Sequence, residues 1–156
     1  MTPGVDAVSK AGISHAIHEY EHDPGSTEYG NEAAEKLGVD PARIFKTLVV
    51  IVDGKMLAVG VVPVTGMLSM KLIARAAGGK KANMADPQEV QRRTGYVLGG
   101  VSPLGQKNRL KTFIDASSAA FDTIYVSAGR RGLEIELSPE DLARLTGGRQ
   151  VPLQQE

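Results

Sequence analysis

A nine-residue apolar run, 44–52, places the tightest constraint on what this chain can fold into. It reads IFKTLVVIV and is apolar everywhere except at Lys46 and Thr47. Strands that are covered on both faces show such near-continuous apolar character, so the run predicts a central β-strand. Asp53-Gly54 follows it and is typical of a tight hairpin turn, which predicts that residues 56–63 return as an antiparallel partner.

Capping residues followed by proline mark the starts of several helices. Thr2-Pro3, Asp86-Pro87 and Ser138-Pro139 show this pattern, and Ser69 and Asn31 are further N-cap candidates. The predicted helices span 3–11, 31–37, 70–77, 87–94 and 139–145, and the remaining strands span 15–22, 80–85, 96–98, 112–114, 123–126 and 133–137. Short helices interleaved with strands predict a mixed α+β fold, and the tail from Leu153 is expected to fray.

Composition limits both the architecture and the chemistry. With 156 residues, of which 42% are hydrophobic, residues 1–156 fit a single domain with its own core. No apolar stretch approaches the roughly 20 residues that cross a bilayer, and the N-terminus lacks a signal-peptide pattern, so we expect a cytoplasmic protein that binds no membrane. The absence of cysteine excludes disulfides, thiolate metal sites and a cysteine nucleophile.

Charge is unevenly distributed although the formal net charge is zero. Residues 18–40 carry seven acidic residues and one lysine, which gives 1 − 7 = −6. Residues 71–111 carry nine basic and two acidic residues, which gives 9 − 2 = +7. A basic zone on a neutral chain suits modest contact with a polyanion, and a solvated surface balanced elsewhere explains the same counts.

A glycine-rich loop, residues 98–106, lies between the predicted 96–98 strand and a cluster of cations. Gly99 and Gly100 have no Cβ, so their peptide groups can adopt positive φ and approach a ligand closely. Pro103 fixes its own φ and biases Ser102 toward extended backbone. The loop therefore suits a backbone-lined site, while a plain tight turn accounts for the same residues.

Polar residues near strand ends supply the other candidates. Lys46 stands at the mouth of the predicted central strand, where its ammonium must reach solvent or meet an anion. Tyr20 shares a strand face with His18 and His22; we expect no metal there, because no further ligand stands at suitable spacing. The turn at 127–132 carries Ser127 and two arginines that can present a fork of donors to a phosphate. All the histidines lie within 15–22, far from the serines of both loops, so the spacing gives no support for a serine triad.

Three segments, in this order and spacing, resemble the YbaK/EbsC family of aminoacyl-tRNA deacylases. They are Phe45-Lys46-Thr47, the GGVSPLG stretch at 99–105 and residues 125–135, with further likeness at 96–97 and 112–115. The family is related to the editing domain of bacterial prolyl-tRNA synthetases. The resemblance implies a YbaK/prolyl-tRNA synthetase-associated domain, with a curved, mixed, largely antiparallel sheet that is partly barrel-like and flanked by short helices.

The resemblance also implies an activity. The free-standing subgroup that the chain most resembles clears cysteine from tRNA(Pro), with Cys-tRNA(Cys) as a second candidate substrate, and needs no cofactor. Its aminoacyl-tRNA substrate supplies its own thiol nucleophile, and prolyl-tRNA synthetase is the expected transient partner. The alternatives are an Ala-tRNA(Pro) deacylase of the same family and a non-catalytic module that binds a nucleotide or an amino acid.

Site roles follow from the family pattern. Lys46 matches the principal cation near the tRNA 3′ end, and Gly100 lies in the backbone wall beside the aminoacyl carbonyl, so both are assigned to catalysis. Substrate binding is assigned to Tyr20, Thr47, Gly99, Ser102, Pro103, Ser127, Arg130 and Glu134. Glu134 stands where the family pattern implies an acidic pocket residue, which is expected to be aspartate in relatives. Because glutamate is longer than aspartate, whether its carboxyl reaches the pocket is left open here.

Overall fold

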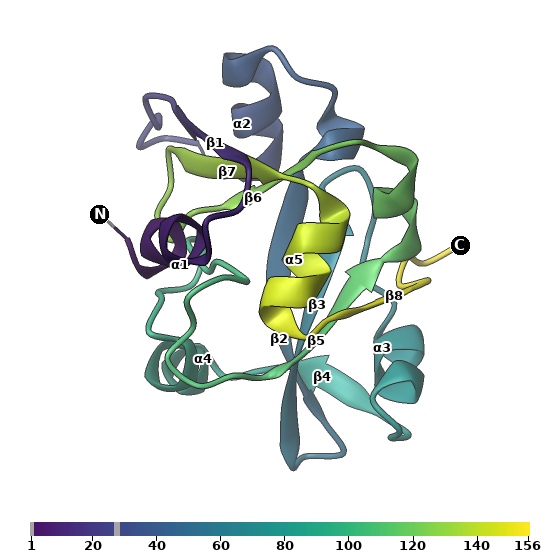
Figure 1. Ribbon diagram of the computed structural model, residues 1–156. Helices are drawn as coiled ribbons and strands as arrows, with labels where there is room; N and C mark the ends of the chain where they lie inside the picture. Colours follow the sequence, from purple (N-terminus) through teal and green to yellow (C-terminus); the bar gives the residue numbers. More distant parts are fainter. Residues whose placement is uncertain (1, 27–28) are drawn as a thin grey trace.

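Two β-sheets that share one core form the framework of the computed structural model, which describes residues 2–26 and 29–156 (Figure 1). The larger sheet has the order β4-β2-β3-β5-β8, with β4 at Ala82–Met84, β2 at Phe45–Val52, β3 at Met56–Pro63, β5 at Lys111–Asp115 and β8 at Arg149–Val151. The smaller sheet has the order β1-β7-β6, with β1 at His15–Glu19, β7 at Leu133–Leu137 and β6 at Ile124–Ser127. The α+β class predicted from the sequence is confirmed.

The β2–β3 hairpin confirms the expected central strand. β2 pairs antiparallel with β3 from Phe45↔Pro63 to Val52↔Met56, and on its other side it pairs with the edge strand β4. The connection has three residues rather than two, because Asp53 and Gly54 both adopt positive φ and the Lys55 N–H donates to the Val52 carbonyl at 3.0 Å. β3 pairs in parallel with β5, and β5 with β8, so the sheet is mixed.

The helices begin where their capping signals stand. They are α1 (Pro3–Ala11), α2 (Tyr29–Leu37), α3 (Met70–Ala76), α4 (Pro87–Thr94), α5 (Pro139–Thr146) and the 3₁₀ segments η1 (Pro41–Arg43) and η2 (Ala116–Ala120). The side chains of Thr2, Ser69, Asp86 and Ser138 accept backbone N–H bonds as N-caps. Asn31 lies inside α2 rather than at its cap, so that predicted boundary is wrong. None of the helices described here is long and apolar enough to span a bilayer.

Two further local predictions are wrong. Residues 96–98 form no strand, because the chain turns at Val97–Gly100, where the Gly100 N–H donates to the Val97 carbonyl at 3.0 Å. The C-terminal tail does not fray: β8 extends the larger sheet and Leu153 is fully buried. Asp115 holds this end, accepting from the Leu153 N–H and from Gln154 Nε2, each at 2.8 Å.

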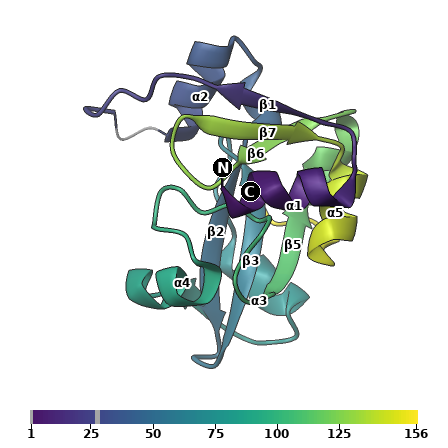
Figure 2. The same cartoon turned by 60° about the vertical axis from the view of Figure 1, so that its left-hand side comes forward.

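The core divides into two layers around the larger sheet. The main layer lies between one face of that sheet and the smaller sheet, and α1, α4 and α5 contribute Val8, Val90 and Leu142 to it (Figure 2). The opposite face is covered by α3, where Ile73 packs in one cluster with Val50 of β2 and Phe113 of β5. β2 is therefore covered on both faces, which is the reason its sequence is apolar from Leu48 to Val52.

Besides sharing a core, the two sheets are linked by one backbone bridge in the described residues. Ile44, immediately before β2, forms an isolated parallel bridge with Tyr125 of β6. The expected single curved sheet is thus replaced by two sheets joined by one bridge, after which β2 pairs with β3 and β4 instead. The strands diverge from this bridge. The start of β2 therefore faces the end of β6 and the start of β7, which are neighbours in the smaller sheet.

Candidate active site

A pocket of about 510 Å³ occupies the space between the two sheets. Its lining residues come from the start of β2, from α2 and α4, from the turn at 98–99 and from the β6–β7 connection. Its polar lining consists of Tyr20, Asn31, Lys46, Thr47, Ser127, Arg130, Arg131 and Glu134. Its volume falls within the range of about 300–1,000 Å³ that small-molecule sites occupy.

The structure brings together seven of the ten residues that were assigned from the sequence. These are Lys46 and Thr47 from β2, Ser127 and Glu134 from the smaller sheet, and Tyr20, Gly99 and Arg130 from loops. The strand register brings two of these residues together, because Ser127 is directly opposite Glu134 in the β6–β7 pair. Tyr20 follows β1, and its N–H donates to the Gly132 carbonyl at 2.9 Å, which fixes the residue beside the same strands.

Lys46 is a half-buried cation without an ion-pair partner among the residues described. Burial lowers the pKa of its ammonium from the ordinary value, since a charged group is disfavoured away from water. An anion or a polarised oxygen in the pocket would relieve that cost. Lys46 is therefore suited to hold a negative or partly negative ligand atom.

Glu134 is one of the residues that line the same pocket. The residue is only 7% exposed, and burial raises the pKa of its carboxyl to about 8. The carboxyl is therefore largely protonated at neutral pH, where it can both donate and accept a hydrogen bond. Burial raises the pKa of Tyr20 to about 12, and the proximity of Glu134 contributes, so the phenol also remains protonated.

Thr47 and Ser127 add hydroxyl groups to this lining. Thr47 Oγ1 is buried and has no hydrogen-bond partner in the part of the chain that the structure describes. Ser127 Oγ accepts the Gly129 N–H at 3.1 Å, so its own hydrogen remains available. The pocket thus combines three cations, Lys46, Arg130 and Arg131, with one largely neutral carboxyl and several hydroxyls.

The glycine loop is placed differently from its assigned role. Gly99 adopts φ +89° and lines the pocket, whereas Gly100 does not line it and uses its N–H in the turn to Val97. Ser102 is fully buried, and its Oγ accepts the Leu104 N–H at 3.1 Å; Pro103 is buried as well. Gly100, Ser102 and Pro103 are therefore not among the described residues that line the pocket, and their assigned roles stay predictions.

Sequence reasoning missed several residues that complete the pocket. Asn31 enters from α2, Arg131 from the β6–β7 connection, and Leu98 and Met84 form an apolar part of the wall. Arg131 packs its guanidinium against Gly99, where a Cβ would lie 2.5 Å from its Nη2 atom. The adjacent arginines of the turn were the available signal for Arg131, while nothing local distinguished Leu98 or Met84 from ordinary core residues.

The pocket holds no activated protein nucleophile. No histidine is among its lining residues in the described ranges, and His18 and His22 instead contact Glu136 and Glu32 at 2.8 and 2.6 Å. The same ranges contain no group of three residues that could hold a metal ion. Neither a serine–histidine pair nor a cysteine stands where a reacting carbonyl would bind.

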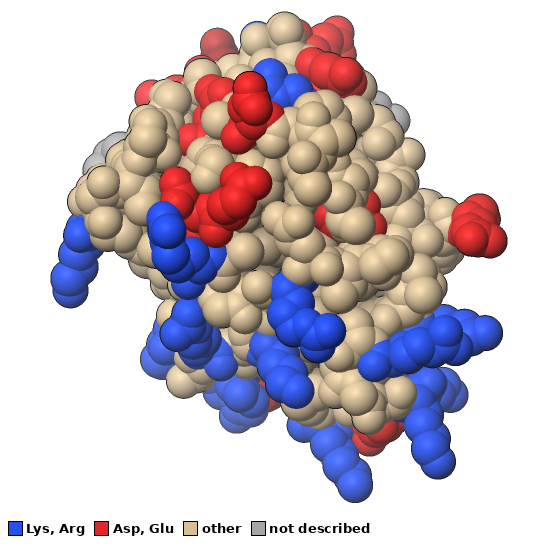
Figure 3. Space-filling model, turned by 45° about the vertical axis from the view of Figure 1, so that its right-hand side comes forward, with Lys and Arg blue, Asp and Glu red and all other residues tan. Residues whose placement is uncertain are grey.

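Charge separates along the molecule. Figure 3 shows Lys and Arg gathered over the half of the visible face that carries α3 and β4, whereas Asp and Glu gather toward the opposite half. Arg130 and Arg131 add positive charge to the lining of the pocket itself.

Comparison with known proteins decides the family. Residues 24–145 match the family model described as "Aminoacyl-tRNA editing domain". The chain belongs to this family. As an aminoacyl-tRNA editing domain it is a deacylase, an enzyme that cleaves an amino acid from tRNA.

Individual relatives agree with the family. The chain is 41% identical over 115 residues to "Putative Cys-tRNA(Pro)/Cys-tRNA(Cys) deacylase EbsC" of Enterococcus faecalis, covering 74% of this chain and 70% of the relative. It is 32% identical over 130 residues to the uncharacterized protein YwhH of Bacillus subtilis, covering 83% and 80%. A crystal structure described as "a putative trans-editing enzyme for prolyl tRNA synthetase" superposes with a TM-score of 0.86 at 25% identity, over 99% of this chain and 96% of that one.

Proposed function

We propose that this editing domain removes cysteine that has been wrongly attached to tRNA(Pro), with Cys-tRNA(Cys) as a further substrate. The relative from Enterococcus faecalis carries both substrates in its name. A synthetase pocket that holds proline cannot strongly reject an amino acid of similar size, so a second site must discard the product.

The observation that carries this proposal is the composition of the pocket. Lys46 is an unpaired cation, Glu134 is a largely neutral acid at neutral pH, and no histidine or cysteine accompanies them among the described lining residues. Such a site can position and polarise an ester but offers no nucleophile of its own. Cysteine brings a thiol, of which a few per cent is ionised near neutral pH and strongly nucleophilic.

The reaction balances without a protein nucleophile. The cysteine sulfur attacks its own ester carbonyl carbon, the bond from that carbon to the ribose oxygen breaks, and the thiol proton ends on the released ribose hydroxyl. The immediate product is a four-membered cyclic thioester, which water then opens to free cysteine. Lys46 stabilises the negative charge that develops on oxygen, while the pocket walls hold the side chain folded toward the carbonyl.

A panel of mischarged tRNAs tests the substrate. The purified protein is incubated with Cys-tRNA(Pro), Cys-tRNA(Cys), Ala-tRNA(Pro), Ser-tRNA(Pro) and Pro-tRNA(Pro), and the remaining aminoacyl ester is measured over time. We expect rapid loss of cysteine alone, because serine offers a far weaker nucleophile of nearly the same shape. Equal loss of alanine and cysteine would instead identify an Ala-tRNA(Pro) deacylase and contradict the thiol-assisted reaction.

We further propose a transient complex with prolyl-tRNA synthetase. A protein with zero formal net charge and a one-sided basic zone binds tRNA only modestly, so a partner is needed to deliver the correct tRNA. Adding the synthetase should raise the rate on Cys-tRNA(Pro) more than the rate on Cys-tRNA(Cys). An equal effect on both tRNAs would rule the complex out as the source of selectivity.

A further inference from the structure

Two of the four large apolar side chains that are exposed in the described ranges line the pocket, and a third is the chain neighbour of one of them. Leu98 is 56% exposed and Met84 48% exposed, and both line the pocket itself; Val97, 58% exposed, precedes Leu98 in the turn. The fourth, Met67, lies elsewhere, where its carbonyl accepts the Gln155 N–H. Isolated exposed apolar residues are common, but a group continuous with a polar pocket marks a binding surface.

The backbone holds Leu98 in this exposed position. Val97 to Gly100 form a turn closed by the Gly100 N–H and the Val97 carbonyl, with Gly99 at φ +89°. Positive φ at the third residue is the geometry of a type II turn, which leaves Leu98 at the outer corner. Arg131 packs directly behind Gly99 and supports this arrangement. An apolar residue at such a corner gains nothing from the protein's own core.

The lining of the pocket therefore has both polar and apolar members. Lys46, Thr47 and Glu134 form a polar part, and Leu98 with Met84 forms an apolar rim that remains open to solvent. Any aminoacyl-tRNA has the matching order of groups, since the ester sits on the ribose of the terminal adenosine and the flat adenine base lies next to it. Bases pack on apolar side chains through their faces without regard to sequence.

We propose that Leu98, Met84 and Val97 form a binding site for the adenine of the terminal adenosine. The inference rests on the proposed function, because it requires the aminoacyl ester to occupy the polar part near Lys46 and Glu134. Charge agrees with this orientation: Arg130 and Arg131 line the pocket on the side of Gly99, where the phosphate that precedes the adenosine would lie. Arg130 forms a surface pair with Glu19 at 3.0 Å and donates to the Arg131 carbonyl at 3.3 Å; such a surface pair exchanges easily for a phosphate.

Substrates with and without the base test this site. The value of kcat/KM is measured for 3′-O-cysteinyladenosine and for cysteine methyl ester, with the unmodified protein and with Leu98→Ser and Met84→Ser. The ratio of interest is kcat/KM for the adenosine ester divided by kcat/KM for the methyl ester. We expect each substitution to lower this ratio about five- to tenfold, because only the adenosine substrate loses a contact. Met67→Ser, which changes an equally exposed methionine away from the pocket, should leave the ratio as it is.

Other outcomes are decisive as well. An unchanged ratio overturns the adenine site. The site is also overturned if the substitutions abolish only the rate increase that prolyl-tRNA synthetase gives, because the rim would then be a contact for that protein. Binding of the amide-linked analogue 3′-cysteinylamino-3′-deoxyadenosine, followed by calorimetry, needs no turnover. If the unmodified protein fails to cleave any cysteinyl ester, the proposed function fails, while weaker binding of this analogue to Leu98→Ser still supports the adenine site.

Discussion

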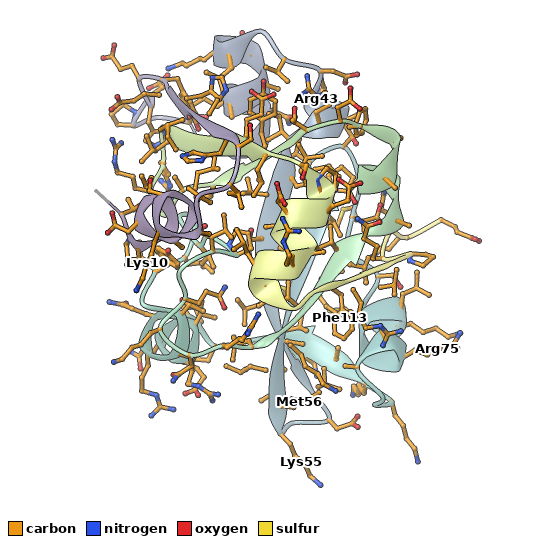
Figure 4. All side chains as sticks on the ribbon, viewed as in Figure 1. Lys10, Arg43, Lys55, Met56, Arg75 and Phe113 are labelled. Carbon is orange, nitrogen blue, oxygen red and sulfur yellow. The ribbon has the colours of Figure 1, made fainter. Side chains whose placement is uncertain are left out.

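Arg43 joins the two sheets of this protein through Glu136. Its Nη2 atom lies 3.3 Å from Glu136 Oε2, and its Nε donates to the Thr123 carbonyl at 3.1 Å. The guanidinium also lies over the Tyr125 ring, 5.1 Å from its centre. Arg43 is the last residue of η1, and Figure 4 shows it at the end of the molecule opposite the Lys55 hairpin tip. Arg43 precedes Lys46 by three residues and Glu136 follows Glu134 by two, so this contact sets how the two walls of the pocket face each other.

Replacing Arg43 should loosen the junction of the sheets. We expect Arg43→Ala to lower the free energy of unfolding by about 1–3 kcal/mol, because it removes the donor to the partly buried Thr123 carbonyl and the ion-pair partner of Glu136. Urea denaturation measures this loss. Arg144→Ala, which removes an exposed pair with Asp141 on α5, should change stability by less than about 1 kcal/mol. Equal losses in the two variants would show that the Arg43 contact has no special role.

Lys46 should be essential for cleavage and dispensable for folding. We expect Lys46→Ala to lower kcat/KM for Cys-tRNA(Pro) by at least about 100-fold, since it removes the charge that stabilises the developing oxyanion. The unfolding free energy should not fall, because burial disfavours the charged ammonium in the folded state. Lys55→Ala, at the hairpin tip, serves as the matched control (Figure 4). Comparable activity in both variants would favour a non-catalytic binding module.

Glu134 should make the protein less stable as pH rises. Burial raises its folded pKa to about 8 from the ordinary 4.5, so between these values the unfolded state releases a proton that the folded state retains. The free energy of unfolding therefore falls as pH rises from 4.5 to about 8, by at most about 1.4 kcal/mol per pH unit. Below pH 4.5 the contribution of Glu134 to stability is fully present and no longer changes with pH. Glu134→Gln should abolish the slope, which denaturation at pH 4.5, 6 and 8 would detect. Parallel pH profiles for the two proteins would contradict the assignment.

Gly99 should not tolerate a side chain. Alanine at φ +89° is strained by about 1–2 kcal/mol, and its Cβ would also overlap the Arg131 guanidinium. We expect Gly99→Ala to raise KM for the tRNA substrate as well as lower stability. Gly12→Ala provides the comparison, since Gly12 has φ +69° and open space around it, far from the pocket residues. If KM rises equally in both variants, the change at Gly99 acts through lower stability and not through the shape of the pocket.

Leu153 should anchor the C-terminal segment. Its side chain is fully buried, and its N–H is held by Asp115, so Leu153→Ala should cost about 2–5 kcal/mol of unfolding free energy. Thermal or urea denaturation gives the value. Met67→Ala, at a side chain that is 63% exposed, should cost less than about 0.5 kcal/mol. A small loss at Leu153 would restore the expectation of a frayed tail.

Local signals in the sequence determined most elements of this fold. The run at 44–52, the Asp53-Gly54 turn and the capping residues before α1, α3, α4 and α5 each act over a few neighbouring residues, so their outcome could be predicted. Contacts distant in sequence decided the rest. Tyr96–Leu98 has the composition of a strand but meets no pairing partner, and β8 has a weak local pattern but finds the edge of β5.

The same division holds for the site. Family likeness indicated Lys46, Tyr20, Ser127 and Glu134, which the fold then gathers into one pocket. It also indicated Gly100, Ser102 and Pro103, but only the tertiary structure showed that these residues face the interior of the loop. Which side of a loop meets a ligand depends on what packs behind it, here Arg131 and Leu104, and no local sequence rule contains that information. The exposed rim at Leu98 and Met84 was undetectable for the same reason, because an apolar residue reveals its role only when the fold leaves it uncovered.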